Sequence, residues 1–240
     1  MMADTLQPSD LAPGLLLGDG AEVAPDVAIG ARVVIHAGSQ VGAGAVLEDG
    51  AVVGKQPHLG AKSTAARDPV APAVVEEGAA VLAGAVVFAG ARLGPRSIVG
   101  DQSHVRERAR LGADTVIGRG TSIDNDVVVG ERVRIQTNCY ITAYCTIEDD
   151  VFIGPGVITT NDNTMARQPL DAPLEGPVLR RASRIGGGAI ICPGVEVGED
   201  AYVAAGAVVA GDVPSHAAVM GIPAREVRGV PDQDLLERWQ

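Results

Sequence analysis

An aliphatic residue returns at every sixth position through most of this chain. Neither a helix, with a period of 3.6 residues, nor a plain strand, with a period of two, produces such a repeat. The period predicts a coil of short parallel strands with the aliphatic side chain pointing inward. Three hexads would make one turn of eighteen residues, and turns would stack at roughly 4.8 Å. The series, all Ile, Leu or Val, comprises Leu17, Val23, Ile29, Ile35, Val41, Leu47 and Val53, then Val75, Val81, Val87, Leu93, Val99, Val105, Leu111, Ile117, Ile123, Val129, Ile135, Ile141, Ile147 and Ile153, then Ile185, Ile191, Val197, Val203 and Val209.

A second slot, four residues after each aliphatic, holds only small or β-branched residues, such as Ala79, Ser97 and Thr115. We expect these side chains to pack inside beside the aliphatic, and we interpret Cys139 and Cys145, which occupy this slot, as packing residues. Glycines directly after the aliphatic are expected to form corners in a left-handed backbone conformation. They are Gly18, Gly30, Gly42, Gly94, Gly112, Gly118, Gly130, Gly154 and Gly198.

Composition narrows the function classes. Aromatic residues make up 2% of the chain, so burial must come from many small repeated contacts. The net charge of −11 disfavours nucleic acid and anionic membranes as partners, because both need a basic face. The N-terminal stretch MMADTLQPSD lacks the features of a signal peptide, and no apolar run is long enough to span a bilayer. With three cysteines outside any metal or disulfide spacing, we expect a reduced, cytoplasmic protein without a metal.

The hexad pattern resembles the left-handed parallel β-helix of the hexapeptide-repeat acyltransferases, and the resemblance covers nearly the whole chain. It implies an all-β fold, a homotrimer, and active sites in the clefts between neighbouring prisms. We predict one domain over 1–240 with two projecting loops and a short C-terminal helix around Leu235, Leu236 and Trp239. The predicted parts are N-terminal coils over 12–56, a loop over 57–73, central coils over 74–159, a loop over 160–182, C-terminal coils over 183–213, and an exit segment and cap over 214–240.

The end of the repeat looks like the acetyl-CoA end of this family. The stretch GIPAR, Gly221 to Arg225, matches the family's closing motif G-x-P-A-[KR]. The resemblance implies that backbone amides near Ala205 and Gly206 bind pantetheine and that Arg225 lies near a coenzyme phosphate. Many relatives have a Lys two residues before the pair corresponding to Asp212-Val213, where this chain has Ala210, and Arg180 is one of the arginines that could replace it. The alternative is that Gly-x-Pro only turns the chain out of the coil.

The middle of the chain resembles N-acetyltransferases of nucleotide-linked 3-amino sugars. In those enzymes a Q-x-N stretch, an acidic pair before V-F-x-G-P, and a T-N loop containing Arg recur. The matching residues here are Gln136, Asn138, Glu148, Asp149, Phe152, Gly154, Pro155, Thr160, Asn161 and Arg167. The family's G-A-N is replaced by Gly186-Gly187-Gly188, and the loop reads TNDNTMAR, both of which bear on the identity of the sugar.

The resemblance implies that Asn138 touches the amine to be acetylated. A sugar amine has a pKa within a few units of neutral, so a useful fraction is the free amine and can attack without a histidine base. Positioning would then carry much of the catalysis. An amide carbonyl can orient an N–H but cannot take its proton. Asn161, Asp162 and Arg167 would contact the sugar or the nucleotide, and Gln136 and Glu148 would support them; Asp162 is also the nearest carboxylate that could receive a proton. The nucleotide is uridine or thymidine diphosphate by family, and Lys55 and Lys62 are diphosphate candidates or simply solvated.

Two other functions stay open. A His-dependent O-acetyltransferase would use His104, or His58 in the first loop, as general base. His104 is expected to point outward in one column with Ser122, Tyr140 and Ile158, about three turns from the Asn161 loop. A non-catalytic trimeric scaffold is the second alternative, although it leaves the Q-T-N, T-N-D-N and GIPAR elements without a purpose.

Overall fold

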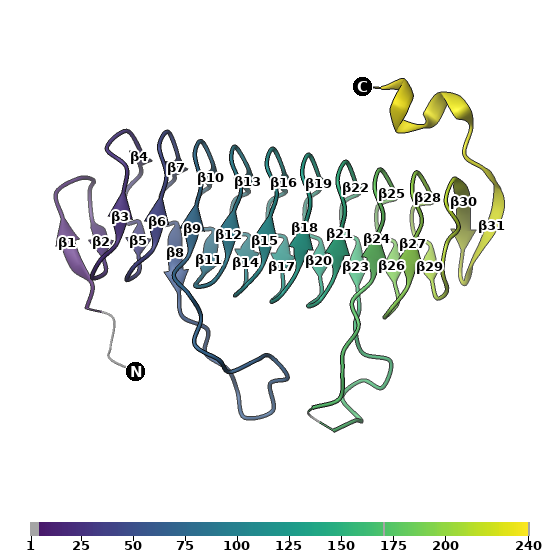
Figure 1. Ribbon diagram of the computed structural model, residues 1–240, viewed down its shortest axis with the longest axis horizontal. Helices are drawn as coiled ribbons and strands as arrows, with labels where there is room; N and C mark the ends of the chain where they lie inside the picture. Colours follow the sequence, from purple (N-terminus) through teal and green to yellow (C-terminus); the bar gives the residue numbers. More distant parts are fainter. Residues whose placement is uncertain (1–4, 170, 240) are drawn as a thin grey trace.

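The computed structural model describes residues 5–169 and 171–239, which form a left-handed parallel β-helix shaped as a three-faced prism (Figure 1). The fold class therefore agrees with the prediction. Three parts of the predictions lie outside the described residues. They are Met1–Asp4, at the start of the stretch MMADTLQPSD, Leu170 of the second loop, and Gln240 of the cap. No helix in the described residues is long and apolar enough to cross a membrane.

The three faces are sheets of 11, 9 and 11 strands over the described residues. The first face contains β1 (Gln7–Ser9), β2 (Leu15–Leu17), β5 (Val34–Ile35), β8 (Val52–Lys55), β11 (Val86–Phe88), β14 (His104–Val105), β17 (Ser122–Ile123), β20 (Tyr140–Ile141), β23 (Ile158–Thr159), β26 (Ile190–Ile191) and β29 (Val208–Val209). The second face contains β3 (Glu22–Val23), β6 (Gln40–Val41), β9 (Val74–Val75), β12 (Arg92–Leu93), β15 (Arg110–Leu111), β18 (Val128–Val129), β21 (Thr146–Ile147), β24 (Val178–Leu179) and β27 (Glu196–Val197).

The third face contains β4 (Ala28–Ile29), β7 (Val46–Leu47), β10 (Ala80–Val81), β13 (Ile98–Val99), β16 (Val116–Ile117), β19 (Arg134–Ile135), β22 (Phe152–Ile153), β25 (Arg184–Ile185), β28 (Tyr202–Val203), β30 (Ala217–Gly221) and β31 (Ala224–Gly229). From β2 to β29, consecutive strands belong to successive faces, so each strand up to β26 pairs with the one three places further along the chain. Only β1 with β2 and β30 with β31 pair antiparallel among the described strands, at the two ends of the prism.

The repeating aliphatic residues form the core, as predicted. From Ile35 to Val209 they are buried, and equivalent residues stack in register, as Ile123 does on Ile141. Leu17, Val23 and Ile29, in the first coil, are only partly buried. The second slot is also inside: Cys139 and Cys145 are buried, and burial raises the pKa of Cys145 to about 12, which fits packing rather than reactivity.

The glycines that follow the aliphatic residues have a different cause from the one expected. Positive φ angles occur two residues later in each corner, as at Gly120 (φ 67°), and not at Gly94 or Gly118. A Cβ on Gly94 would lie 2.7 Å from the carbonyl oxygen of Leu111 in the next coil. Glycine is therefore required there because adjacent coils approach too closely for a side chain.

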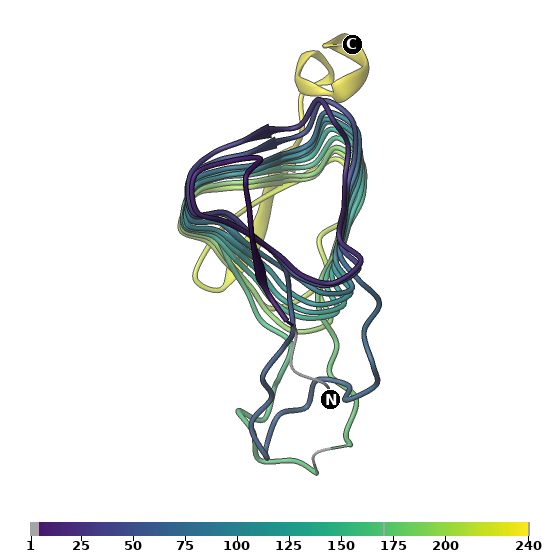
Figure 2. The same cartoon turned by 90° about the vertical axis from the view of Figure 1, so that its left-hand side faces the viewer.

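Both loops leave the prism at the corner between the first and second faces, here called the loop corner, and project on one side (Figures 1 and 2). The first loop lies between β8 and β9, and the second between β23 and β24. The second loop ends earlier than predicted, because Val178 and Leu179 already pair in the second face, opposite Thr146 and Ile147. Thr159 stays in the prism and is buried in the slot where an aliphatic was due.

The prism also continues beyond the predicted end of the coils at residue 213. Ala218 and Val219 of β30 pair with Tyr202 and Val203, and the chain then returns antiparallel through β31. The C-terminal segment contains two short 3₁₀ helices, η1 (Asp232–Asp234) and η2 (Leu236–Arg238), in place of one helix. Trp239 at its end is 76% exposed, while the N–H of Leu236 donates to Asp200 Oδ1 at 3.0 Å.

Candidate functional site

A cavity of about 400 Å³ lies between the two loops over the loop corner. Lys62–Ala65 of the first loop form one wall, and Asn161, Asp162 and Gln168 of the second loop form another. The floor consists of corner residues from the coils between the loops. The cavity thus joins segments about a hundred residues apart in the sequence, and it lies within a single chain.

A continuous chain of hydrogen bonds crosses the floor of this cavity. Glu107 is fully buried and accepts from Arg106 at 2.8 and 3.2 Å. Arg106 Nη1 also donates to Asp124 Oδ1 at 2.6 Å, and Tyr140 Oη donates to Asp124 Oδ2 at 2.9 Å. Burial, together with the neighbouring Asp124 carboxylate, raises the pKa of Tyr140. This chain therefore fixes Arg106, Asp124 and Tyr140 in place.

The sequence did not single out Arg106, Glu107 and Asp124 as site residues. The run RERAR from Arg106 to Arg110 is typical of a solvated, charged surface. Glu107 is nevertheless buried, and this burial arises only when the coils pack together. A signal was nevertheless present: Arg106 and Asp124 are one coil of eighteen residues apart, which places opposite charges on adjacent rungs.

His104 lies beside this chain, in the predicted column. Its register runs from His104 to Ser122, from Ser122 to Tyr140, and from Tyr140 to Ile158, so His104 is three coils from the second loop, as predicted. A second cavity of about 300 Å³ on the first face is lined by His104 and shares Arg106, Asp124 and Tyr140 with the loop cavity. Lys55 reaches the same cavity, with its Nζ 5.2 Å from the centre of the Phe88 ring.

The predicted residues of the second loop are placed mainly by the loop itself. Asn161 Nδ2 donates to the carbonyl of Ala143 at 3.2 Å. Asp162 accepts from the Ala166 N–H at 2.6 Å and from both the N–H and the hydroxyl of Thr164. These bonds lower the pKa of Asp162, so its carboxylate is ionised at neutral pH and is a weak base. Arg167 is exposed and does not line the cavity.

Asn138 lies at another corner, between the third and first faces, here called the Asn138 corner. It is exposed and left-handed, with φ at 58°. The equivalent position in each coil forms a column, in which Gly156, Gly188 and Gly206 follow Asn138 toward the C-terminal end. A Cβ on any of these three glycines would meet no described atom within 4 Å, so the corner beyond Asn138 is open.

The predicted coenzyme residues Ala205, Gly206 and Arg225 lie at this end of the chain. Ala205 and Gly206 are exposed, three coils from Asn138. The GIPAR stretch forms the turn between β30 and β31, and β30 pairs directly with β28, which leads into Ala205. Arg225 is exposed, and its Nη1 donates to the carbonyl of Ala224 at 2.8 Å. Gln136, half-buried, shares the corner of Asn138.

Glu148 and Arg180 lie at the remaining corner, between the second and third faces. Arg180 donates to Glu148 at 2.8 Å and to Glu196 at 2.7 Å, and these two carboxylates raise its pKa further. Glu148 also accepts from the N–H of Arg181 at 2.8 Å. Within one chain, neither residue meets Asn138 or the loops. Their predicted contacts with substrate and coenzyme stay predictions.

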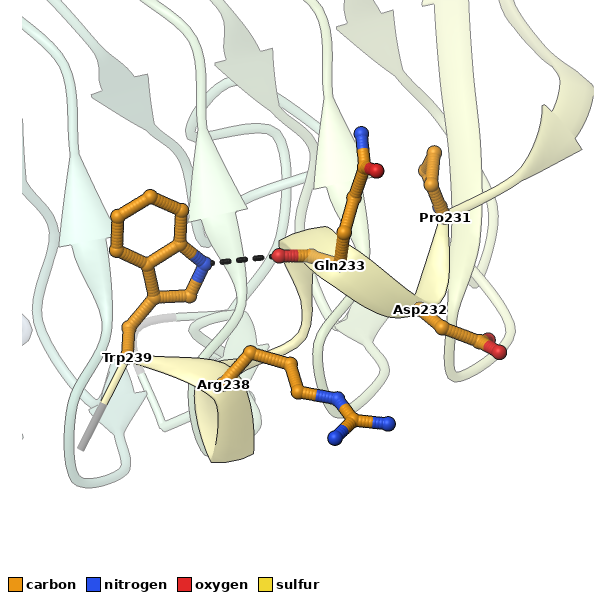
Figure 3. A pocket seen from close by; sticks show the side chains of 5 residues that line it. All are labelled: Pro231, Asp232, Gln233, Arg238 and Trp239. Carbon is orange, nitrogen blue, oxygen red and sulfur yellow. Dashed lines mark hydrogen bonds between the residues drawn. The ribbon is translucent and has the colours of Figure 1, made fainter.

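A hollow beside the C-terminal 3₁₀ helices is lined by Pro231, Asp232, Gln233, Arg238 and Trp239, with Trp239 Nε1 donating to the carbonyl of Gln233 at 3.0 Å (Figure 3). It lies on the side of the prism away from both loops. Within residues 5–169 and 171–239, no three His, Cys, Asp or Glu side chains are grouped to hold a metal ion.

Family models match the repeat. The model described as bacterial transferase hexapeptide (six repeats) matches residues 126–161 and 176–211, and the model described as hexapeptide repeat of succinyl-transferase matches residues 25–55 and 107–143. Together they cover about half of the chain, including the Asn138 corner and the second-loop boundary.

Curated relatives match part of the chain. A 2,3,4,5-tetrahydropyridine-2,6-dicarboxylate N-acetyltransferase from Enterococcus faecalis is 42% identical over 65 residues, covering 27% of this chain and 28% of the relative. A serine acetyltransferase from Escherichia coli is 36% identical over 120 residues, covering 49% of this chain and 37% of the relative. The chain thus spans well under half the length of these relatives.

A solved structure matches nearly the whole chain. A UDP-N-acetylglucosamine acyltransferase from Bacteroides fragilis covers 91% of this chain and 76% of its own, with a TM-score of 0.59 and 12% identity. At that identity the likeness establishes the fold alone.

Proposed function

Because two hexapeptide-repeat transferase models together match about half of the chain, we propose that it transfers an acetyl group from acetyl-CoA to the amine of a nucleotide-linked amino sugar. The observation that carries this proposal is the relation between Asn138 and the open column that ends at Gly206. The motif residues around Asn138 support the amine as acceptor, and the Enterococcus faecalis relative is also an N-acetyltransferase by name. The pathway would build a surface polysaccharide or a glycoside, in the cytoplasm.

The Asn138 corner fits an extended coenzyme arm. Three coil spacings separate Asn138 from Gly206, roughly 14 Å along the prism. Glycines at the two intervening positions leave the surface smooth, so an arm could lie against the backbone. Exposed backbone at Ala205 offers hydrogen bonds to pantetheine amides, and Arg225 offers a cation for phosphate. Acetyl-CoA would supply the thioester carbon that the amine attacks.

The roles of the chain's own residues follow from this placement. Asn138 would hold the amine with its carbonyl oxygen on an N–H, so that the nitrogen lone pair faces the thioester. The new N–C bond forms as the C–S bond breaks, and the amine loses its proton to solvent or the departing thiolate. Asp162 would not take this proton, because its ionised carboxylate is a weak base. Its role would be to hold its loop and to contact the acceptor.

The same proposal includes a homotrimer. Outward positions on the first and third faces are mainly apolar, as at Val86, Ile158 and Ile98, whereas the second face presents charges such as Arg92 and Arg110. The first and third faces flank the Asn138 corner, so packing them against neighbouring chains would put this corner in a cleft between prisms. Light scattering coupled to size-exclusion chromatography should give the mass of three chains per particle. The mass of a monomer would contradict this part of the proposal.

A second candidate function is O-acetylation with His104 as general base. The observation that favours it is the shared cavity, in which His104 lies with Arg106, Asp124 and Tyr140. A hydroxyl acceptor needs a base more than an amine does.

A thiol-release assay with acetyl-CoA separates these functions. The panel contains uridine and thymidine diphosphate amino sugars and, as hydroxyl acceptors, the corresponding unaminated sugars. We expect turnover with an amino sugar, and a His104→Ala variant that retains most of it. Turnover with hydroxyl acceptors alone, lost in His104→Ala, would establish the second candidate. No turnover with any acceptor would favour a scaffold.

A further inference from the structure

We propose that the cavity between the two loops binds an uncharged, hydroxyl-bearing ring of the acceptor, either its ribose or its pyranose, and that Asp124 and Tyr140 determine this recognition. The inference rests on the proposed function only for the identity of the acceptor. The cavity itself, its charges and its hydrogen-bonding groups are properties of the folded chain.

The charges of the cavity argue against a phosphate in it. Lys62 and Arg106 line the cavity together with Asp124 and Asp162, so cations and carboxylates balance. Arg106 is the central cation, and it is held by both Asp124 and the buried Glu107. A guanidinium already paired with two carboxylates has little attraction left for an anion, which would also face the Asp124 and Asp162 carboxylates.

The free hydrogen-bonding positions suit hydroxyl groups. Asp124 Oδ1 accepts from Arg106 at 2.6 Å and from the Asn125 N–H at 2.9 Å, and Oδ2 accepts from Tyr140. Tyr140 donates its proton to Asp124, so its oxygen, which the Thr142 side chain also contacts, and the remaining lone pair of Oδ2 are adjacent acceptors. Asn161 donates one of its two amide N–H groups to Ala143, and its carbonyl oxygen is a third acceptor beside the second N–H. Acceptors of this kind bind O–H donors and repel anions.

The walls and size also fit a ring. Tyr140 and Tyr144 line the cavity with Leu174 and Pro169, and Tyr140 is 41% exposed. Flat or apolar surfaces of this kind can cover the C–H face of a sugar. The volumes of about 400 and 300 Å³ for the two adjoining cavities lie within the usual range of small-molecule sites.

The position along β20 connects this cavity to the proposed chemistry. Asn138 precedes β20 at one corner, Tyr140 lies on it, and Thr142 follows it at the loop corner. At about 3.3 Å per residue, Asn138 and Thr142 are roughly 13 Å apart. Thr159 fixes that far end, because its buried hydroxyl accepts from the Thr142 N–H at 2.8 Å. An acceptor with its amine at Asn138 can therefore extend along β20 into the cavity.

This placement gives the first loop a function. Ala65 is buried, with 7% exposure, so the loop packs as a wall of the cavity. Bonds within the loop hold its shape: the Ser63 N–H donates to the Gly60 carbonyl at 3.0 Å, and Arg67 Nη2 donates to the same carbonyl at 2.7 Å. The loop would close the cavity around the ring and limit the size of accepted rings.

The first experiment measures steady-state kinetics of Tyr140→Phe and Asp124→Asn. Each removes an acceptor that contacts the ring, so we expect the KM for the acceptor to rise about tenfold or more, while the KM for acetyl-CoA and kcat stay within about twofold. Asp114→Asn is the matched control, because Asp114 makes the same one-coil pair with Arg96 at a corner without loops. An unchanged acceptor KM in Tyr140→Phe, with a wild-type melting temperature, would overturn the inference.

The second experiment measures binding without turnover, by calorimetry of the full chain with uridine, with the free amino sugar and with the uridine diphosphate amino sugar. Loss of uridine binding in Asp124→Asn assigns the cavity to the ribose, and loss of free amino sugar binding assigns it to the pyranose. Wild-type protein that binds none of the three, and none of the corresponding thymidine compounds, would overturn the inference. If only hydroxyl acceptors are turned over, the proposed function fails, while the inference still stands or falls on the KM of Tyr140→Phe for that acceptor.

Discussion

Asn138 and Gly206 occupy the same left-handed position of one corner of the prism, three coils apart. Their φ angles are 58° and 69°. Gly156 and Gly188 hold the two positions between them, so Asn138 is the last side chain in the column before the C-terminal end. A coenzyme arm lying on these glycines would end beside the Asn138 amide, and this is the basis of the proposed acetyl transfer.

The first prediction concerns the surface between these residues. Gly188→Asn would place a side chain on the open corner, in a left-handed conformation that Asn tolerates. We expect the KM for acetyl-CoA to rise at least about tenfold. Gly84→Asn is the control, because Gly84 has a similar φ of 65° in the same column but lies on the far side of Asn138. Equal KM values in the two variants would show that the coenzyme does not lie on this corner.

A second prediction concerns Gly120, the position below Asn138 in the column. A Cβ there would lie 2.5 Å from Asn138 Oδ1, so Gly120→Ala must displace the amide. We expect kcat/KM for the acceptor to fall at least about tenfold. Gly44→Ala is the control: it adds the same left-handed strain, about 1–2 kcal/mol, but its Cβ meets no atom of the described chain within 4 Å. Similar activities at similar stabilities would argue against a role for the Asn138 amide.

The sequence predicts those parts of the fold that depend on contacts repeated from one coil to the next. The period of six fixes which residues are inside, the register of His104 on Ser122 and Tyr140, and the corner that carries Asn138. Each of these follows from contacts between neighbouring coils, which repeat along the chain. The prediction was wrong about why glycines follow the aliphatic residues. The period shows where glycine is needed, but it does not show whether the cause is a left-handed φ or the close approach of the next coil.

The loop cavity could not be predicted in the same way. Its walls come from two insertions that follow no period, and their meeting depends on where both loops fold back. The burial of Glu107 and the self-contained turn at Asp162 arise from that tertiary arrangement and from local hydrogen bonds. The last coil was missed for a related reason, because β30 joins the third face after a break in the hexad count.

A third prediction concerns acid stability. Arg108 holds Asp126 with two bonds of 2.6 and 2.7 Å, and although burial opposes ionisation, bonds from Arg108 and Asn125 lower the pKa of Asp126 overall. A lowered folded pKa means that the stabilisation is present above the unfolded pKa, about 3.9, and is lost as pH falls through the folded value.

Urea midpoints at pH 7, 5 and 3 test this linkage for wild type and Asp126→Asn. We expect the variant to be less stable at pH 7 and 5, and the difference to shrink at pH 3. A difference that stays constant over this range would show that ionisation of Asp126 does not stabilise the fold.

The most direct test of the central claim compares Asn138→Gly with Gln102→Gly. Both residues are left-handed members of the same column, with φ of 58° and 57°, so glycine removes the side chain and leaves the backbone unstrained. With the amine positioned by the Asn138 amide, kcat/KM for a nucleotide amino sugar falls roughly 100-fold in Asn138→Gly and stays near wild type in Gln102→Gly. Equal kcat/KM values for Asn138→Gly, Gln102→Gly and wild type would contradict the account.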